Sequence, residues 1–147
     1  MILKRAIRKQ LGELLIERKI ITPEQLDKAL DLQKKQGGLL GEILIELGFA
    51  KEEDIAQILT AQYGFPYLPL SNYEINPQVI ELVPLRIAKQ YLLIPIDKIG
   101  NNITLAMSNP LNTQAIEDIE ILTGCNVQVF ISTSSDIKKA IDEYYKK

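Results

Sequence analysis

Apolar residues in the first half of the chain recur at helical spacing, and the whole pattern is written twice. Segment 11–17 reads Leu-Gly-Glu-Leu-Leu-Ile-Glu, and segment 40–46 reads Leu-Gly-Glu-Ile-Leu-Ile-Glu. The match continues from 24–33 into 53–62, where apolar residues again recur every three or four positions. Such spacing places apolar side chains on one face of a helix, and a repeated unit indicates repeated structure. The pattern predicts two tandem helical hairpins that pack as a four-helix bundle.

Cap residues mark the ends of these helices. Thr22 is followed by Pro23, the arrangement of an N-cap and a first helical position. Lys51 has the equivalent place in the second copy and is a poorer cap, offset by acidic residues in the first turn that follows. Gly48 stands where the end of a helix favours a left-handed residue. We therefore expect a short turn inside each hairpin.

The pattern changes after Tyr63. Gly64, Pro66 and the prolines that follow cannot sit inside one continuous helix. This change predicts a boundary between a helical tandem-repeat subdomain, residues 1–65, and a second subdomain, residues 66–147.

The second subdomain combines strand and helix patterns. Short helices are expected at 78–83 and 85–90, strands at 92–99, 103–107 and 127–131, and amphipathic helices at 115–122 and 136–145. Ser134 and Ser135 are the expected caps of the last helix. Strands with segregated helices imply an α+β fold, with this half forming a small α/β sandwich.

The composition argues against an enzyme. There is no histidine, which removes the commonest general base and metal ligand, and the single Cys125 has no partner for an internal disulfide. We expect Cys125 to be a buried small hydrophobe. Carboxylate or lysine chemistry remains formally open. The sequence lacks the phosphate loop Gly-x-x-x-x-Gly-Lys-[Ser/Thr], so it does not contain the site of a P-loop ATPase.

Charge and hydropathy favour a cytoplasmic location. A net charge of −2 argues against a DNA- or RNA-binding protein. No apolar run approaches the roughly 20 residues of a membrane-spanning helix, and the first residues lack the apolar stretch of a signal peptide. We expect no direct membrane insertion.

The doubled pattern Leu-Gly-x-x-[Leu/Val]-[Leu/Ile] followed by Leu-x-x-Ala-Leu-x-x-Gln resembles the MshEN-type domain. Segments 105–111, Leu-Ala-Met-Ser-Asn-Pro-Leu, and 121–124, Ile-Leu-Thr-Gly, are also similar to that family. MshEN-type domains precede the motor of type II secretion and type IV pilus assembly ATPases, and some members bind cyclic di-GMP through the two repeats. The resemblance implies a non-catalytic regulatory domain without a cofactor. Its partners would be a secretion or pilus motor ATPase or an inner-membrane assembly protein.

A cyclic di-GMP site would need hydrogen-bond donors for two phosphates, apolar faces for two guanines, and polar groups for the guanine edges. Gly12 and Gly41 lack Cβ and allow a backbone to approach a ligand, so we expect both at the surface beside one groove. The apolar candidates are Leu11, Leu26, Leu30, Leu40, Ile55 and Leu59, and the polar candidates are Arg8, Gln10, Gln33, Glu42, Gln62 and Asn109.

Each candidate also has a structural explanation. The leucines have the spacing of a bundle core, the glycines can serve helix packing, and the glutamines can be solvated helix ends. Asn109 can act as the N-cap of the following helix, which is the interpretation we favour.

Four positions depart from the family pattern. Gln10 and Leu39 stand where ligand-binding members usually have arginine before Leu-Gly, Lys19 replaces a glycine, and Asn109 replaces an aspartate. Arg8 and Glu42 retain charged groups near the two motifs. The alternative function is therefore a protein–protein interaction adaptor that docks on the motor or an inner-membrane assembly protein without binding a nucleotide.

Overall fold

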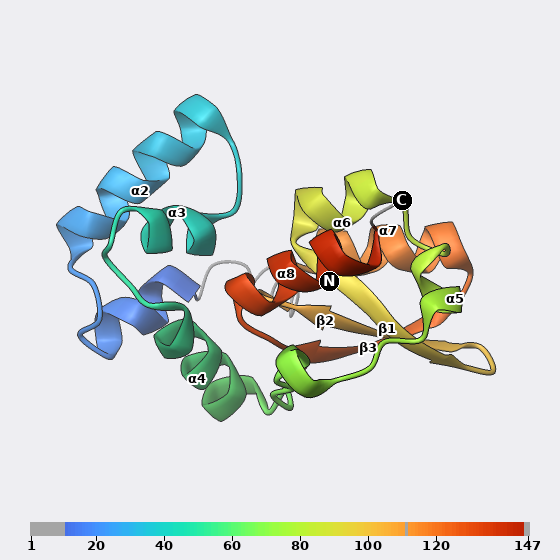
Figure 1. The fold of residues 1–147 in the computed structure, drawn as a ribbon. Helices are drawn as coiled ribbons and strands as arrows, with labels where there is room; N and C mark the ends of the chain where they lie inside the picture. Colours follow the sequence, from blue (N-terminus) through green and yellow to red (C-terminus); the bar gives the residue numbers. More distant parts are fainter. Residues whose placement is uncertain (1–10, 111, 146–147) are drawn as a thin grey trace.

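The structure is a computed structural model that describes residues 11–110 and 112–145. It is an α+β fold in which a helical part, residues 11–63, lies beside a sheet part, residues 66–145 (Figure 1). This confirms the predicted fold class. The division of the chain between residues 65 and 66 into two subdomains stays a prediction.

The helical part contains the predicted hairpins. Residues 11–17 are helical, and α2 (Pro23–Gln36), α3 (Leu40–Glu46) and α4 (Glu52–Tyr63) follow. Thr22 caps α2 with a capping box, in which its side chain accepts from the N–H of Gln25 and the Gln25 side chain accepts from the N–H of Thr22. Lys51 makes no side-chain cap to α4, as expected of a poorer cap residue.

The two repeats have the same backbone turn. Lys19 donates its N–H to the carbonyl of Ile16 at 2.9 Å, and Gly48 donates to the equivalent Ile45 carbonyl at 3.0 Å. Both residues are left-handed, with φ of 62° at Lys19 and 78° at Gly48. The repeat seen in the sequence is therefore a structural repeat, although one copy lacks glycine at its turn.

The sheet part is built around three strands. Its elements, in chain order, are η1 (Leu70–Asn72), α5 (Pro77–Ile80), α6 (Leu85–Tyr91), β1 (Leu93–Ile99), β2 (Asn102–Met107), α7 (Thr113–Thr123), β3 (Asn126–Ile131) and α8 (Ser134–Tyr144). β1 and β2 form an antiparallel hairpin, and β3 pairs parallel to β2 after the α7 crossover. The sequence placed each of these strands and the long helices to within two residues. The predicted cap of α8 was wrong, because the side chain of Thr133 accepts from Asp136 instead.

Helices cover both faces of the sheet. Successive residues of a strand point to opposite faces. On one face Ile103, Leu105 and Met107 of β2 pack with Ala115 and Ile119 of α7, and all five side chains are fully buried. On the other face the strands meet α5, α6 and α8. Burying each large apolar side chain contributes roughly 1.5–3 kcal/mol, so this double coverage stabilises the sheet part.

Ile131 connects the sheet to the helical part. It is fully buried at the end of β3 and packs into the core of the helical bundle. Its N–H donates to the Pro66 carbonyl and its carbonyl accepts from the N–H of Leu68, both at 2.8 Å. These bonds fix the segment that follows α4 beside β3. α4 itself contacts β3, whereas α2 lies on the far side of the bundle (Figure 1).

The turn residues yield a matched stability test. Lysine in a left-handed conformation costs on the order of 1 kcal/mol relative to glycine. Lys19→Gly should therefore raise the free energy of unfolding by up to about 1 kcal/mol, and Gly48→Ala, which adds a Cβ in open space at positive φ, should lower it by about as much. Urea unfolding of both variants measures the two changes. If the free energy of unfolding changed in the same direction in both variants, the equivalence of the two turns would be contradicted.

A hydrogen bond between α6 and α7 yields a pH-dependent prediction. The hydroxyl of Tyr91 donates to a carboxylate oxygen of Asp118 at 2.5 Å, and the Gln114 amide donates to the other oxygen at 2.8 Å. Both bonds lower the pKa of Asp118 below its ordinary value of 3.8, and the Tyr91 bond has the larger effect. A carboxylate with a lowered pKa contributes stability above the pKa it has in the unfolded chain, and this contribution is lost as pH falls through the folded pKa.

Tyr91→Phe should therefore be less stable than the unmodified chain near neutral pH, and the difference should shrink below about pH 4. Urea unfolding of both proteins at about pH 7 and pH 3 measures it. An unchanged difference would show that the Asp118 charge does not contribute through this bond.

Candidate functional site

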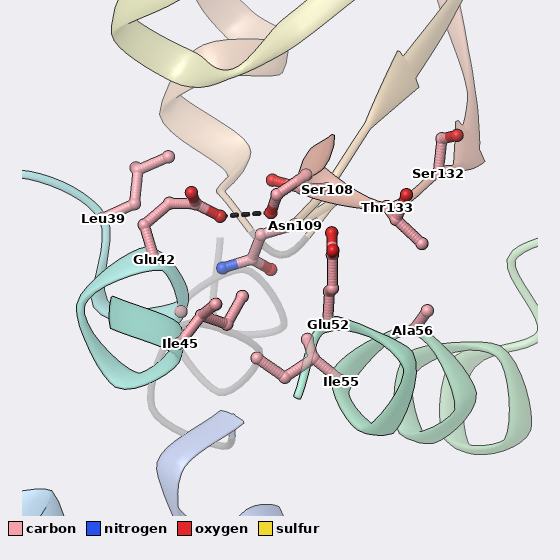
Figure 2. A pocket seen from close by; sticks show the side chains of 12 residues that line it. Leu39, Glu42, Ile45, Glu52, Ile55, Ala56, Ser108, Asn109, Ser132 and Thr133 are labelled. Atoms are coloured by element: carbon pink, nitrogen blue, oxygen red, sulfur yellow. Dashed lines mark hydrogen bonds between the residues drawn. The ribbon is translucent and has the colours of Figure 1, made fainter. Parts of the chain in front are cut away.

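Two loops meet the helical bundle at one edge of the sheet. Because β2 and β3 are parallel, their carboxyl ends lie at the same edge, and the loops beginning at Ser108 and Ser132 emerge side by side. Ligands of open sheets with parallel strands commonly bind at this edge. Here the loops face α3 and α4 of the second repeat across a narrow crevice (Figure 2).

The crevice is small and mixed in chemistry. Its cavity volume is about 10 Å³, room for on the order of one water molecule. The bundle contributes mostly apolar groups and two carboxylates, and the loops contribute hydroxyls and one amide. The lining residues are Leu39, Gly41, Glu42, Ile45, Glu52, Ile55, Ala56, Ser108, Asn109, Ser132, Thr133 and Ser134.

Two carboxylates join the bundle to the first turn of α8. Glu42 accepts a hydrogen bond from the Ser134 hydroxyl, drawn as a dashed line in Figure 2, and forms an ion pair with Lys138 at 3.1 Å. Glu52 accepts from the backbone N–H of Ser135 at 2.8 Å and from its hydroxyl at 2.5 Å. The first backbone N–H groups of a helix lack partners within the helix and favour anions. The Glu52 carboxylate therefore fills a position that suits an anion.

The electrostatics of the crevice are acidic. No basic residue occurs among the described residues that line it. Asn109 lies between Glu42 and Glu52 in the view of Figure 2. Lys138, which pairs with Glu42 at 3.1 Å, is not part of the lining, so a phosphate in this space would lie beside both carboxylates. Binding of an anionic ligand therefore requires these carboxylates to move, or a cation to be supplied from outside the described lining.

Comparison with known proteins identifies the family. The family model for the MshEN domain matches residues 63–147, more than half of the chain. The chain belongs to the MshEN domain family. This confirms the resemblance inferred from the sequence, and the matched range begins at the end of α4 and covers the whole sheet part.

Relatives and solved structures extend the similarity over this MshEN chain. The type IV pilus assembly ATPase PilB of Myxococcus xanthus is 35% identical over 136 residues, 92% of this chain and 24% of that protein. The type II secretion system protein E of Xanthomonas campestris is 26% identical over 148 residues, 97% of this chain and 26% of that protein. The chain thus spans about a quarter of the length of these relatives. A solved structure of MshE with cdg, cyclic di-GMP, is 30% identical, with a TM-score of 0.69, and covers 93% of this chain and 99% of that one.

Four of the predicted site residues line the crevice of this MshEN chain. They are Gly41, Glu42, Ile55 and Asn109. The favoured interpretation of Asn109 as a helix cap was wrong, because the side chain of Asn112 caps α7 by accepting from the N–H of Ala115. The ligand-binding role of the four crevice residues stays a prediction. All four come from the second repeat or from the loop after β2.

The expected exposure of the two glycines was wrong. Gly12 and Gly41 are both buried. A Cβ on Gly12 would lie 2.9 Å from both terminal methyl groups of Leu26, whereas a Cβ on Gly41 would meet only Ile55 Cδ1, at 3.8 Å. Gly12 therefore serves close packing between the helices of the first hairpin. Gly41 has ordinary space around it and borders the crevice.

The remaining candidates that the structure describes do not line the crevice. Leu11 and Leu59 are buried in the core of the bundle, Leu26 is half-buried, and Leu30 is 37% exposed. Gln33 donates its side-chain amide to the Gly38 carbonyl at 3.0 Å, and Leu40 is half-buried. Arg8, Gln10 and the side chain of Gln62 lie outside the described residues. For the leucines other than Leu30, the structural explanation accounts for the spacing, because they lie in the bundle core or pack against it.

Sequence reasoning missed Glu52 and most of the loop side of the site. Glu52 of α4 was counted only among the acidic residues that follow Lys51, and the loop residues Ser132 and Thr133 were not singled out. The available signal was the parallel pairing of β2 and β3, which requires both following loops to lie at one edge. A strand–helix–strand pattern from 102 to 131 indicated that pairing.

The described part of the chain contains no helix that is long and apolar enough to cross a membrane. Within residues 11–110 and 112–145, no group of three or more histidine, cysteine, aspartate or glutamate residues is arranged to hold a metal ion. Cys125 is buried, with 6% of its surface exposed, as its sequence context predicted.

The different surroundings of Gly12 and Gly41 predict different effects of alanine on stability. Alanine exceeds glycine in helix propensity by about 1 kcal/mol in a helix interior. Gly41→Ala should leave the free energy of unfolding unchanged or raise it by up to about that amount, because its Cβ makes an ordinary contact. Gly12→Ala should be the less stable variant, because the Leu26 side chain must move. Thermal and urea unfolding of the pair measure this order, and the reverse order would contradict the packing role of Gly12.

Proposed function

We propose that this MshEN chain is a non-catalytic regulatory domain of a cytoplasmic type IV pilus or type II secretion assembly ATPase, with cyclic di-GMP as its candidate ligand at the crevice. The observation that carries this proposal is the likeness to MshE with cyclic di-GMP across 93% of the chain. The position of the crevice supports it further, since Gly41 of the second Leu-Gly motif and Asn109 of the family-like segment 105–111 both line it. The motor of the same assembly ATPase, or an inner-membrane assembly protein, is the proposed partner that receives the signal.

Binding would have to open the crevice. A cyclic dinucleotide is many times larger than the water-sized space between α3, α4 and the two loops. One phosphate would compete with the Glu52 carboxylate for the N–H of Ser135 at the start of α8. The energy needed to displace Glu42 and Glu52 from Ser134 and Ser135 reduces the observed affinity. We therefore expect weak binding that separates the bundle from α8, which is the movement a regulatory domain would transmit.

A second candidate function is the adaptor that docks on a motor or an inner-membrane assembly protein without a nucleotide. The acidic lining of the crevice and the burial of both glycines favour it, because neither feature suits a ligand with two phosphates. The two functions differ in whether cyclic di-GMP binds at all.

Calorimetric titration with cyclic di-GMP distinguishes the two functions. Gln10→Arg and Asn109→Asp restore the residues usual in ligand-binding relatives. A well-formed bidentate pair to a guanine edge contributes about 1–3 kcal/mol, roughly tenfold to a hundredfold in dissociation constant. The double variant should therefore bind more tightly than the unmodified chain. Asn109→Asp alone should gain less, because its carboxylate joins Glu42 and Glu52 around the crevice.

Gly41→Ala is the matched test of the site, since it should fold normally yet place a methyl group at the crevice wall. It should weaken any binding that the double variant shows. No heat and no shift in melting temperature for the double variant at high micromolar nucleotide would remove the ligand from the proposal and leave the adaptor.

A further inference from the structure

A second hollow lies next to the crevice and has a different character. Its cavity volume is about 420 Å³, compared with about 10 Å³ for the crevice. Tyr67 and Thr133 form one side, and Glu53, Gln57, Thr60 and Ala61 of α4 form the other. Unlike the crevice, this hollow has room for a side chain from another molecule.

The ring of Tyr67 is exposed although its backbone is fixed. The flanking residues Pro66 and Leu68 both hydrogen-bond to Ile131 of β3 at 2.8 Å. The Tyr67 residue nevertheless keeps 46% of its surface exposed. A firmly positioned, half-exposed tyrosine is characteristic of binding surfaces, because its ring makes contacts with little loss of conformational freedom.

The carboxylates around Tyr67 favour a positively charged group in the hollow. The pKa of the Tyr67 hydroxyl is raised, mainly by partial burial and to a smaller extent by the nearby carboxylates of Asp136, Glu53 and Glu52. Glu52 is engaged by Ser135, whereas Glu53 makes no ion pair or side-chain hydrogen bond within residues 11–110 and 112–145. A negative potential over an aromatic ring repels phosphate and attracts a cation.

We propose that this hollow is a docking site for an arginine side chain of a partner protein. The planar guanidinium stacks on the Tyr67 ring, while its N–H groups donate to the Glu53 carboxylate and the Gln57 amide oxygen. Arginine fits better than lysine because a guanidinium combines a flat face with a fork of donors that matches a carboxylate. The site is separate from the nucleotide proposal, and either can fail while the other stands.

The test is a titration of the isotopically labelled chain, followed by nuclear magnetic resonance. N-acetyl-arginine amide is the probe, and N-acetyl-citrulline amide, which has nearly the same shape without the charge, is the control. We expect millimolar binding of the arginine probe, with shifts confined to Tyr67 and the α4 residues of the hollow. The citrulline probe should bind at least about tenfold more weakly, and N-acetyl-lysine amide about threefold more weakly.

Variants locate the site. Glu53→Gln keeps the side-chain shape without the charge and should weaken arginine binding about threefold to tenfold, and Tyr67→Leu should have a similar effect. Glu120→Gln, on the exposed side of α7, is the matched control and should change nothing. The amide spectra of the variants report whether each one is folded.

Three results would overturn the proposal. They are equal binding of arginine and citrulline, shifts spread over all acidic surfaces, and shifts of Tyr67 and α4 by cyclic di-GMP at lower concentration than by arginine. The last result would make the hollow a base-binding site. Cyclic di-GMP shifts confined to the crevice leave the arginine proposal intact, provided that the arginine probe shifts the hollow as expected.

Discussion

The parallel pairing of β2 with β3 determines where the crevice forms. It brings the loops after both strands to one edge, and it directs the first turn of α8 toward the bundle. Glu42 and Glu52 then reach that turn from α3 and α4 and bond to Ser134 and Ser135. The crevice, its acidic lining and the contact between bundle and sheet all depend on this single pairing. A change of register there would separate the carboxylates from the helix start.

The duplication explains the bundle more fully than it explains a ligand site. Both repeats need a left-handed residue after their first helix, and both bury the residue after the first leucine. The two copies differ because the second repeat lies against the sheet part, with α3 bonded to α8 through Glu42 and α4 in contact with β3. Leu59 on α4 is fully buried, whereas its counterpart Leu30 on α2 is 37% exposed. The same motif therefore has one role in packing within the first hairpin and another at the interface of the second.

The sequence predicted the elements of the fold well because strong local signals mark them. Thr22 with Pro23 begins α2, Gly100 forms the turn of the β1–β2 hairpin, and the repeat itself specifies the bundle. The site was harder to predict, because its residues come from four separated segments. Asn109 illustrates the difficulty: its residue type allows a helix cap, yet Asn112 is also suited to capping and holds that position. Only the packing of the bundle on the sheet shows that Glu52 belongs with Ser135.

The two cavities share part of their walls, so a ligand in one would act on the other. Ala56 of α4 and Thr133 of the β3–α8 loop line both the crevice and the Tyr67 hollow. A ligand that separates α4 from α8 changes the distance across the hollow, and a partner side chain that binds between α4 and Tyr67 holds α4 in place. Two sites affect each other when each one binds one arrangement of a shared element better than the other arrangement. The shared element here is α4, and the carboxylate of its Glu52 would have to leave Ser135 for α4 to separate from α8.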